Sequence, residues 1–180
     1  MHHRFLLVPV TAAAIVAPAE AMTYLTVEQA QVVLFPGAAF SPDFRTMTSE
    51  QVKAIEKASR VNVLTRSLRA WRASTGGWFL VDEVVGKHEF ITFALALDET
   101  GGVKGIEILE YREAYGDQIR QAPWRGQFLG LHHGAKLKLT DDIKNISGAT
   151  LSCLHVTDGV KRLLATHALV LAPTPAPSRG

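Results

Sequence analysis

NISGATLS, residues 145–152, lies between a polar run and a segment with helical periodicity. The polar run is TDDIK, residues 140–144. Downstream, apolar residues recur mostly at spacings of two to four positions, which places them on one broad face of an α-helix: Leu151, Leu154, Val156, Val160, Leu163, Leu164 and Ala168. The sequence therefore predicts that residues 147–150 stand where a helix begins.

The beginning of a helix leaves several backbone N–H groups without an intrahelical acceptor. Such a position is capped well by a hydroxyl group, and it also attracts an anion. Gly148 stands between the hydroxyl residues Ser147 and Thr150, and a glycine there lets the backbone approach a phosphate closely. Two interpretations fit this pattern: an ordinary hydroxyl cap, which is common before helices, and a phosphate site.

The string Ser147-Gly148-Ala149-Thr150, after a polar turn and before a helix, resembles the flavinylation motif of the FMN-binding domain family. That family includes subunits C and G of the Na+-translocating NADH:quinone reductase and of the Rnf complex. The resemblance implies that FMN is the cofactor and that a flavin transferase joins it, through its phosphate, to the hydroxyl of Thr150. The resulting diester keeps a negative charge, which a helix N-terminus stabilises.

Other parts of the chain share this resemblance, which covers residues 77–168. Residues 106–116 are similar to a family segment that ends in Glu-Thr-Pro-Gly, and Trp124 and Phe128 resemble a Trp-x-x-x-Phe helix beneath the site. Asn145 stands where the family usually has Asp. The cofactor-binding residues that the resemblance implies are Thr150 as the covalent attachment point, with Ser147, Gly148, Ala149, Leu151, Asn145, Glu113, Tyr115 and Gly116. Tyr115 is open to two interpretations, a flavin-packing side chain or part of a structural loop.

The composition limits the classes of protein. A chain of 180 residues favours one domain, and 47% hydrophobic residues are enough for a real core. Lys and Arg number 19 against 17 Asp and Glu, with no basic block or interleaved aromatic stripe, so no nucleic-acid partner is expected.

The two ends of the chain differ from its centre. Residues 1–21 read as a secretory signal peptide, with a weakly positive start, an apolar stretch and a small-x-small site that predicts cleavage after Ala21. The alternative is an N-terminal membrane anchor, for which the stretch is short and interrupted by prolines. We expect a periplasmic protein whose domain spans residues 22–172, followed by a Pro-rich, disordered tail at 173–180.

Between these ends the pattern predicts an α+β fold, an antiparallel meander flanked by helices. Capping boxes at Thr26 and Thr48 each begin a helix, with a loop at residues 40–46 between them. Strands are expected at residues 61–73, 78–85, 88–97 and 103–111, joined by short Gly-containing turns. A further edge strand is expected at residues 136–139.

Other residue types that often carry chemistry also occur in the chain. Cys153 is the only cysteine, so it is expected to be a small buried apolar side chain. His132 and His133 are adjacent and would point to opposite faces of a strand, and no second ligand pair has a recognised spacing, so no metal site is expected. Glu113 is expected to form an exposed pair with Arg112. No residues are assigned to catalysis.

The sequence thus predicts an exported electron carrier, not an enzyme, whose partners are a flavin transferase and a membrane or periplasmic redox protein. Two alternatives remain open. One is a periplasmic binding or interaction module of the same fold with non-covalent FMN or none, favoured by Asn145. The other is a reductase that holds FMN non-covalently and needs a substrate pocket.

Overall fold

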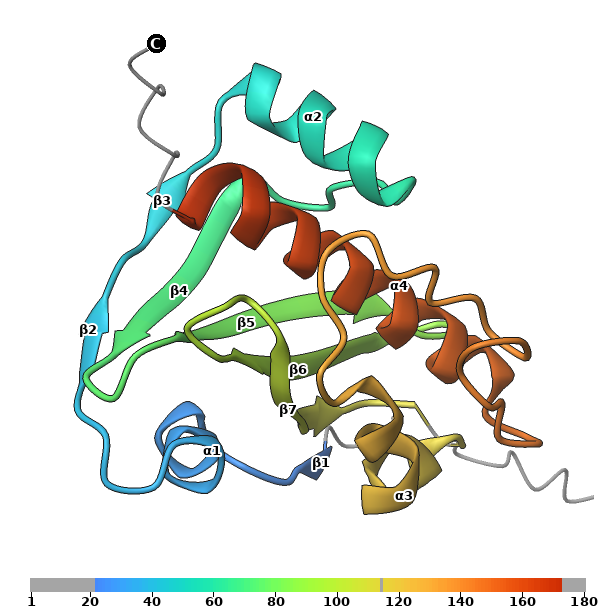
Figure 1. Cartoon of the computed structure of the whole chain (residues 1–180). Helices are drawn as coiled ribbons and strands as arrows, with labels where there is room; N and C mark the ends of the chain where they lie inside the picture. Colours follow the sequence, from blue (N-terminus) through green and yellow to red (C-terminus); the bar gives the residue numbers. More distant parts are fainter. Residues whose placement is uncertain (1–21, 114, 173–180) are drawn as a thin grey trace, which may run out of the picture.

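The computed structural model describes residues 22–113 and 115–172, and Figure 1 shows their arrangement. They form one antiparallel sheet in the order β1-β7-β6-β5-β4-β2, with β3 also paired to β4. The strands are β1 (Met22–Thr23), β2 (Phe40–Pro42), β3 (Arg45–Thr46), β4 (Ser67–Ala73), β5 (Trp78–Val85), β6 (Phe90–Leu97) and β7 (Val103–Tyr111). The helices are α1 (Val27–Leu34), α2 (Ser49–Ser59), α3 (Ala122–Arg125) and α4 (Thr150–Thr166). The predicted signal peptide and tail lie outside the described residues.

The meander from β4 to β7 confirms the predicted α+β class. Consecutive strands pair along their length. Their side chains either alternate between buried and exposed or are buried on both faces, as in β6, where only Phe90 is exposed. At the turn between β4 and β5, Gly77 has φ +86°, and a Cβ there would lie 2.2 Å from the carbonyl oxygen of Leu97. Only glycine fits such a close approach.

Helices cover the sheet on its two faces, as Figure 1 shows. On one face, α4 packs Val156 and Val160 into a core that includes Phe93, and α2 adds Ile55 at its edge. On the other face, α1 packs a smaller cluster through Ala30 and Leu34. Because both faces of the central strands are buried, the sheet is the scaffold on which the ends of α4 and the connecting loops are placed.

The first two helices begin as the sequence predicts. Thr26 and Thr48 accept hydrogen bonds from the backbone N–H groups of Gln29 and Gln51, and each glutamine returns a bond to the threonine N–H. Two backbone donors are satisfied in each box, which defines where the helix starts. At its other end, α2 stops at Arg60, which is left-handed with φ 59°.

Three predicted elements were wrong. Residues 40–46 are not a loop, because Phe40–Pro42 and Arg45–Thr46 pair with β4 as short edge strands. The strand predicted from residue 61 begins only at Ser67. Residues 136–139 form no strand, since Leu137 has φ 47° and only an isolated bridge joins Leu139 to Ile143. Pairing with β4 decides residues 40–46, and contacts within a folded loop decide residues 136–139; local alternation reports neither.

The predicted C-terminal helix is α4, which runs from Thr150 to Thr166 and continues as a π-helical turn to Leu171. Cys153 on this helix is fully buried, as predicted, and burial raises the pKa of its thiol. No helix within the described residues is long and apolar enough to span a membrane.

Candidate functional site

The beginning of α4 carries no side-chain cap. Its N-cap is Ala149, so neither Ser147 nor Thr150 is the capping hydroxyl, and the cap interpretation of the sequence is wrong. The first intrahelical bond runs from the N–H of Cys153 to the carbonyl of Ala149 at 2.9 Å. The N–H groups of Thr150, Leu151 and Ser152 have no acceptor within the described part of the chain. Three free donors at a helix start favour an anion.

The space in front of these donors is open. Gly148 has φ +84°, and a Cβ built on it would meet nothing within 4 Å. Ser147 and Gly148 are exposed, whereas Ala149 is buried and anchors the turn. A phosphate therefore has both free donors and room at this turn, and the residues present fit such a group.

Thr150 is the first residue of the helix and is exposed. The side-chain amide of Asn145 donates a hydrogen bond to Thr150 Oγ1 at 2.9 Å. This bond holds the hydroxyl oxygen in place and leaves its proton unshared. An Asp at position 145 would instead accept that proton, because a carboxylate has no donor.

The segment after β7 lies against the same helix start. Tyr111, at the end of β7, donates its hydroxyl proton to the carbonyl of Tyr115 at 2.5 Å. Its oxygen lies 2.8 Å from Ser152 Oγ, so Ser152 is the donor in that bond. Burial raises the pKa of the Tyr111 hydroxyl, although the bond from Ser152 opposes the shift. Tyr111 thus ties the loop of Tyr115 to the first turn of α4.

Gly116 makes this contact possible. It has φ +102°, and a Cβ there would lie 2.5 Å from the Tyr111 hydroxyl and 2.9 Å from Ser152 Oγ. Tyr115 is 86% exposed and Leu151 is 41% exposed, so both residues present apolar surface to solvent. Gly116 and the carbonyl of Tyr115 thus lie at the first turn of α4, where Leu151 follows Thr150.

Glu113 has a different role from the predicted one. Its Oε1 accepts hydrogen bonds from the backbone N–H groups of His88 at 2.5 Å and Glu89 at 2.9 Å. Burial raises the pKa of this carboxyl, but the N–H groups of Glu89, His88 and Lys87 outweigh burial and hold the pKa below its ordinary value of 4.5. Glu113 therefore fixes the turn between β5 and β6 to the loop after β7.

Arg112, the predicted partner of Glu113, pairs with Glu110 at 3.0 Å. The turn is held a second time from α4, because His155 Nδ1 lies 3.0 Å from the carbonyl oxygen of Gly86 and donates to it. The turn after β5, the loop after β7 and the first turns of α4 therefore form one connected site.

The helix α3 supports the segment that leads into Asn145. Trp124 Nε1 donates to the carbonyl of Lys144 at 3.0 Å, and Gln127 Oε1 accepts from the N–H of Lys144 at 2.7 Å. Trp124 also packs edge-on against Phe128, with ring centroids 5.1 Å apart. Trp124 and Phe128 therefore contact each other, but they do not share one helix, because α3 ends at Arg125 and a 3-10 turn carries Phe128.

Tyr111, Ser152 and His155 contribute to the site, but the sequence did not single them out. Tyr111 ends a strand whose inward positions are apolar. A buried tyrosine needs a partner for its hydroxyl, and this is the one signal in the sequence that could have drawn attention to it.

Part of the chain matches a known protein family. Residues 86–165 match the FMN-binding domain family. The match begins at the turn held by Glu113 and ends inside α4, so it contains all nine predicted cofactor-binding residues. It confirms the resemblance predicted from residues 147–150. The match supports FMN as the cofactor and therefore indicates a flavin-binding protein. No curated protein matches the chain.

The chain also has hollows away from Thr150. A groove of about 400 Å³ runs beside α4 and includes His155, Val84 and Val85. A larger cavity of about 910 Å³ lies farther along α4, and none of the predicted cofactor-binding residues lines it. No group of three or more His, Cys, Asp or Glu residues that could hold a metal ion is found among residues 22–113 and 115–172.

Proposed function

We propose that the protein is an exported flavoprotein that carries FMN as a phosphoester on Thr150 Oγ1 and acts as an electron carrier. One observation carries the proposal: an exposed threonine hydroxyl stands beside three backbone N–H groups without acceptors, inside the segment that matches the FMN-binding domain family. When bound, FMN supplies the exchange of one or two electrons.

The chain's own residues have distinct roles in this proposal. The N–H groups of Thr150, Leu151 and Ser152 bind the phosphate oxygens, and the partial positive charge of the helix start stabilises the charge that the ester retains. Asn145 orients the hydroxyl oxygen that forms the ester bond. Tyr115 and Leu151 offer apolar surface to the flavin ring.

Two anchors keep these groups together. The Tyr111 hydroxyl joins the Tyr115 loop to Ser152, and Glu113 joins that loop to the turn after β5. The first turn of α4 and the apolar surface beside it are therefore preorganised, which lowers the ordering cost of holding a cofactor.

Export would explain why the cofactor is attached covalently. The signal peptide predicted at residues 1–21 would deliver the chain to the periplasm, where free FMN is scarce and a dissociated cofactor would be lost. A flavin transferase would form the ester, and a membrane or periplasmic redox protein would exchange electrons with the product. The proposal assigns the protein a carrier role rather than catalysis on a substrate.

The test is the intact mass of the exported protein, made in a host that supplies a flavin transferase and purified under denaturing conditions. We expect a chain that begins at Met22 with an added mass of one FMN less one water. Thr150→Ala should abolish the addition, and Thr150→Ser should retain it. Ser41→Ala is the control, because it removes an exposed hydroxyl on β2, outside the motif, and should leave the addition intact. Covalent flavin on Thr150→Ala protein would refute the assignment.

A second function is favoured by Asn145. Because Asn145 donates to Thr150 Oγ1, it cannot accept the proton that leaves when the ester forms. The alternative is a periplasmic binding or interaction module with non-covalent FMN or none. An unmodified wild-type mass, together with flavin attachment in Asn145→Asp protein, would favour this module, whereas a fully modified wild type would exclude it.

A further inference from the structure

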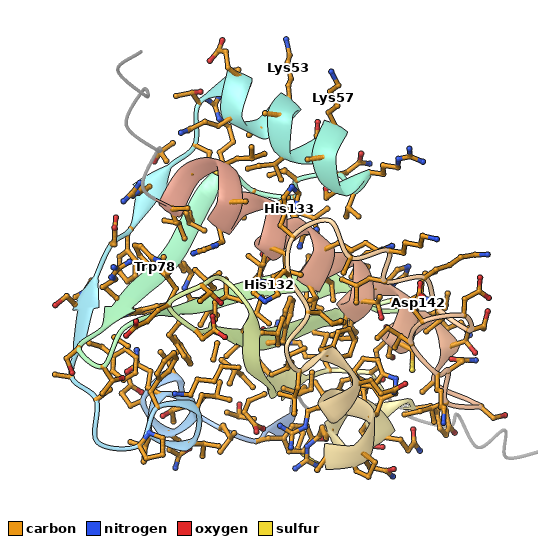
Figure 2. All side chains as sticks on the ribbon, viewed as in Figure 1. Lys53, Lys57, Trp78, His132, His133 and Asp142 are labelled. Carbon is orange, nitrogen blue, oxygen red and sulfur yellow. The ribbon has the colours of Figure 1, made fainter. Side chains whose placement is uncertain are left out.

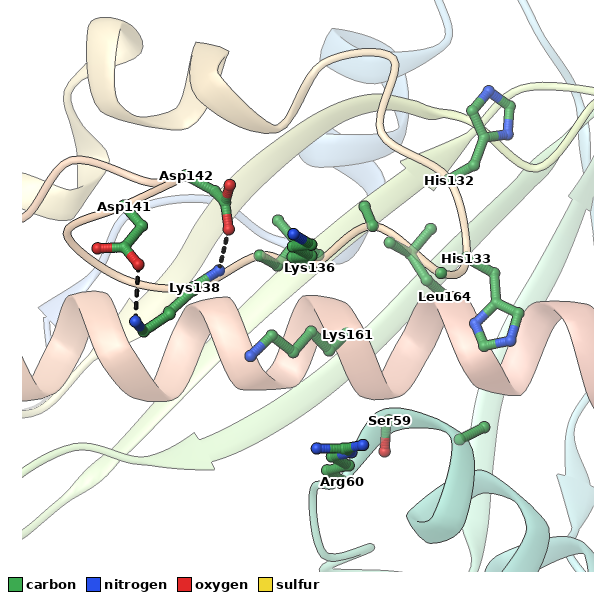
Figure 3. A pocket seen from close by; sticks show the side chains of 14 residues that line it. Ser59, Arg60, His132, His133, Lys136, Lys138, Asp141, Asp142, Lys161 and Leu164 are labelled. Atoms are coloured by element: carbon green, nitrogen blue, oxygen red, sulfur yellow. Dashed lines mark hydrogen bonds and ion pairs between the residues drawn. The ribbon is translucent and has the colours of Figure 1, made fainter.

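A large cavity lies away from Thr150. Its volume is about 910 Å³. Figure 3 shows its three sides: the C-terminal end of α2 at Arg60, the segment of residues 132–142, and α4 at Lys161 and Leu164. Lys161 is eleven residues beyond Thr150, which is about 16 Å along a helix. The cavity is therefore separate from the proposed flavin site.

The charge that lines this cavity is mainly positive. Four cationic side chains face it from three elements, against two acidic ones: Arg60, Lys136, Lys138 and Lys161, with Asp141 and Asp142. In Figure 3, Lys161 lies on α4 between Arg60 on one side and Lys136 on the other. Cations brought together from three separate elements repel one another and need an anion to offset the cost.

Both acidic residues are bound to Lys138. Asp141 pairs with the Lys138 ammonium at 2.7 Å, and Asp142 accepts the backbone N–H of Lys138 at 2.9 Å. Lys161 is paired with Asp158 at 3.3 Å. Arg60 and Lys136 have no ion-pair partner among the described residues. The lining therefore keeps more cationic than acidic side chains, and Arg60 and Lys136 are the two cations in it without an ion pair within the described part of the chain.

Backbone strain gathers at the same place. Three non-glycine residues of the described chain have positive φ: Arg60 at 59°, Leu137 at 47° and Thr140 at 76°. Arg60 and Leu137 line the cavity, and Thr140 precedes Asp141. Leu137 is buried, so its strained backbone is fixed, with Lys136 and Lys138 on either side. Backbone strain of this kind clusters at ligand sites.

The two histidines of the segment do not turn the cavity into a metal site. His132 lies against the turn between β6 and β7, where a Cβ on Gly102 would come within 2.9 Å of its ring. Figure 3 shows His133 at the opposite end of the cavity from Asp141 and Asp142. The two rings are therefore not placed to share one ion with the carboxylates.

We propose that this cavity binds a small molecule through a phosphate group. The volume lies within the range of about 300–1,000 Å³ that is typical of small-molecule sites. A phosphate monoester carries about −1.5 to −2 charges at pH 7 and three acceptor oxygens, so one phosphate can contact Arg60 and Lys136 together, whereas one carboxylate carries a single charge and two oxygens. The guanidinium of Arg60 suits bidentate contact with phosphate oxygens.

The experiment is an NMR titration of the Thr150→Ala protein, which removes the ester site from consideration. The probe is inorganic phosphate, and malonate, a dicarboxylate, is the comparator at equal ionic strength. We expect saturable shifts at Arg60, Lys136 and Lys161, with tighter binding of phosphate than of malonate. Because each lost contact is a charge-assisted hydrogen bond, Lys136→Ala and Arg60→Ala should each weaken phosphate binding at least about tenfold.

Lys57→Ala is the matched control. Lys57 is on α2 close to Arg60, but its side chain points outward to solvent, as Figure 2 shows. Removing the Lys57 side chain should leave the affinity for phosphate unchanged. If Lys57→Ala weakened phosphate binding as much as the cavity variants do, general surface charge would explain the effect and the proposal would be overturned. Shifts confined to residues 150–152, or malonate binding as tightly as phosphate, would also overturn it. Unchanged far-UV circular dichroism checks that each variant is folded.

Discussion

The two ends of α4 differ in what satisfies their polar groups. At its start, Ala149 provides no side-chain cap, and Thr150 and Leu151 are exposed. In its second half, Arg162 and Thr166 are buried. Arg162 donates to Asp82 Oδ2 at 2.6 and 3.1 Å and to the carbonyls of Asn62 and Glu83, and Thr166 donates to the carbonyl of Arg162 at 2.9 Å.

This difference separates stability from function within one helix. The buried half has its hydrogen bonds made by the chain itself, so a change there costs folding free energy. The exposed start has three N–H groups left over, which water can satisfy without a ligand and a phosphate can satisfy with one. Substitutions at the start should therefore change what the protein binds more than how stable it is.

The largest effect is expected for Arg162→Ala. It leaves the Asp82 carboxylate buried without its partner, and breaking such a pair costs about 3–5 kcal/mol in free energy of unfolding. Urea denaturation measures this cost. Lys161→Ala, the neighbouring change, should cost no more than about 0.5 kcal/mol because its pair with Asp158 is partly exposed. A loss below 1 kcal/mol for Arg162→Ala would contradict the assigned role of the pair.

A smaller effect is expected for Gly116→Ala, which crowds the Tyr111 hydroxyl and Ser152. Gly148→Ala is its matched control, because Gly148 also has positive φ but open space around a Cβ. Both variants bear the backbone strain, about 1 kcal/mol. Gly116→Ala should lose a further 1–3 kcal/mol or so from overpacking. Equal losses in thermal or urea unfolding would show that the loop does not pack tightly on α4.

A third prediction concerns pH. Because the folded pKa of Glu113 lies below its ordinary value of 4.5, this carboxylate stabilises the fold above that pH. The contribution is lost as the pH falls through the folded pKa. Glu113→Gln should therefore show a shallower loss of stability below pH 4.5 than wild type, by about 1 kcal/mol across the acid limb.

Glu110→Gln is the control for this measurement, since Glu110 pairs only with the exposed Arg112. Denaturant midpoints from pH 6 to pH 3 give the comparison. Parallel curves for wild type and Glu113→Gln would mean that Glu113 does not hold the turn through its charge.

The smallest effect on stability is expected for Thr150→Ala. Thr150 is the first residue of the helix rather than its cap, and Ala is a good helix former, so the free energy of unfolding should change by less than about 0.5 kcal/mol. The same variant should lose its covalent flavin. A cost above 1 kcal/mol in urea denaturation would mean that the bond from Asn145 is structural.

Local patterns predicted much of the fold. The capping boxes at Thr26 and Thr48 need only residues three apart, and the hairpins from β5 to β7 need only apolar strands with glycine turns. The predictions for residues 40–46 and 136–139 were wrong for a related reason. Their conformations depend on β4 or on contacts within a folded loop, and short stretches carry no sign of either.

The candidate site, too, was predicted only where its residues are close together in the sequence. The sequence pointed to residues 147–150 because Gly and two hydroxyls before a helical stripe form a recognisable local string. It did not indicate that Glu113 bonds the turn at His88, or that Tyr111 reaches Ser152 across 41 residues. A hydrogen bond between distant segments depends on where the sheet places them.

By itself, then, the sequence determined the class of fold, the start of two helices and the family resemblance of residues 147–150, because these depend on residues within a few positions of one another. Only the tertiary structure decided that the helix start is uncapped, that the loop after β7 lies against it, and that Arg60, Lys136 and Lys161 share a cavity. Such outcomes depend on the sheet and α4 together, since packing brings side chains from distant segments within hydrogen-bonding range.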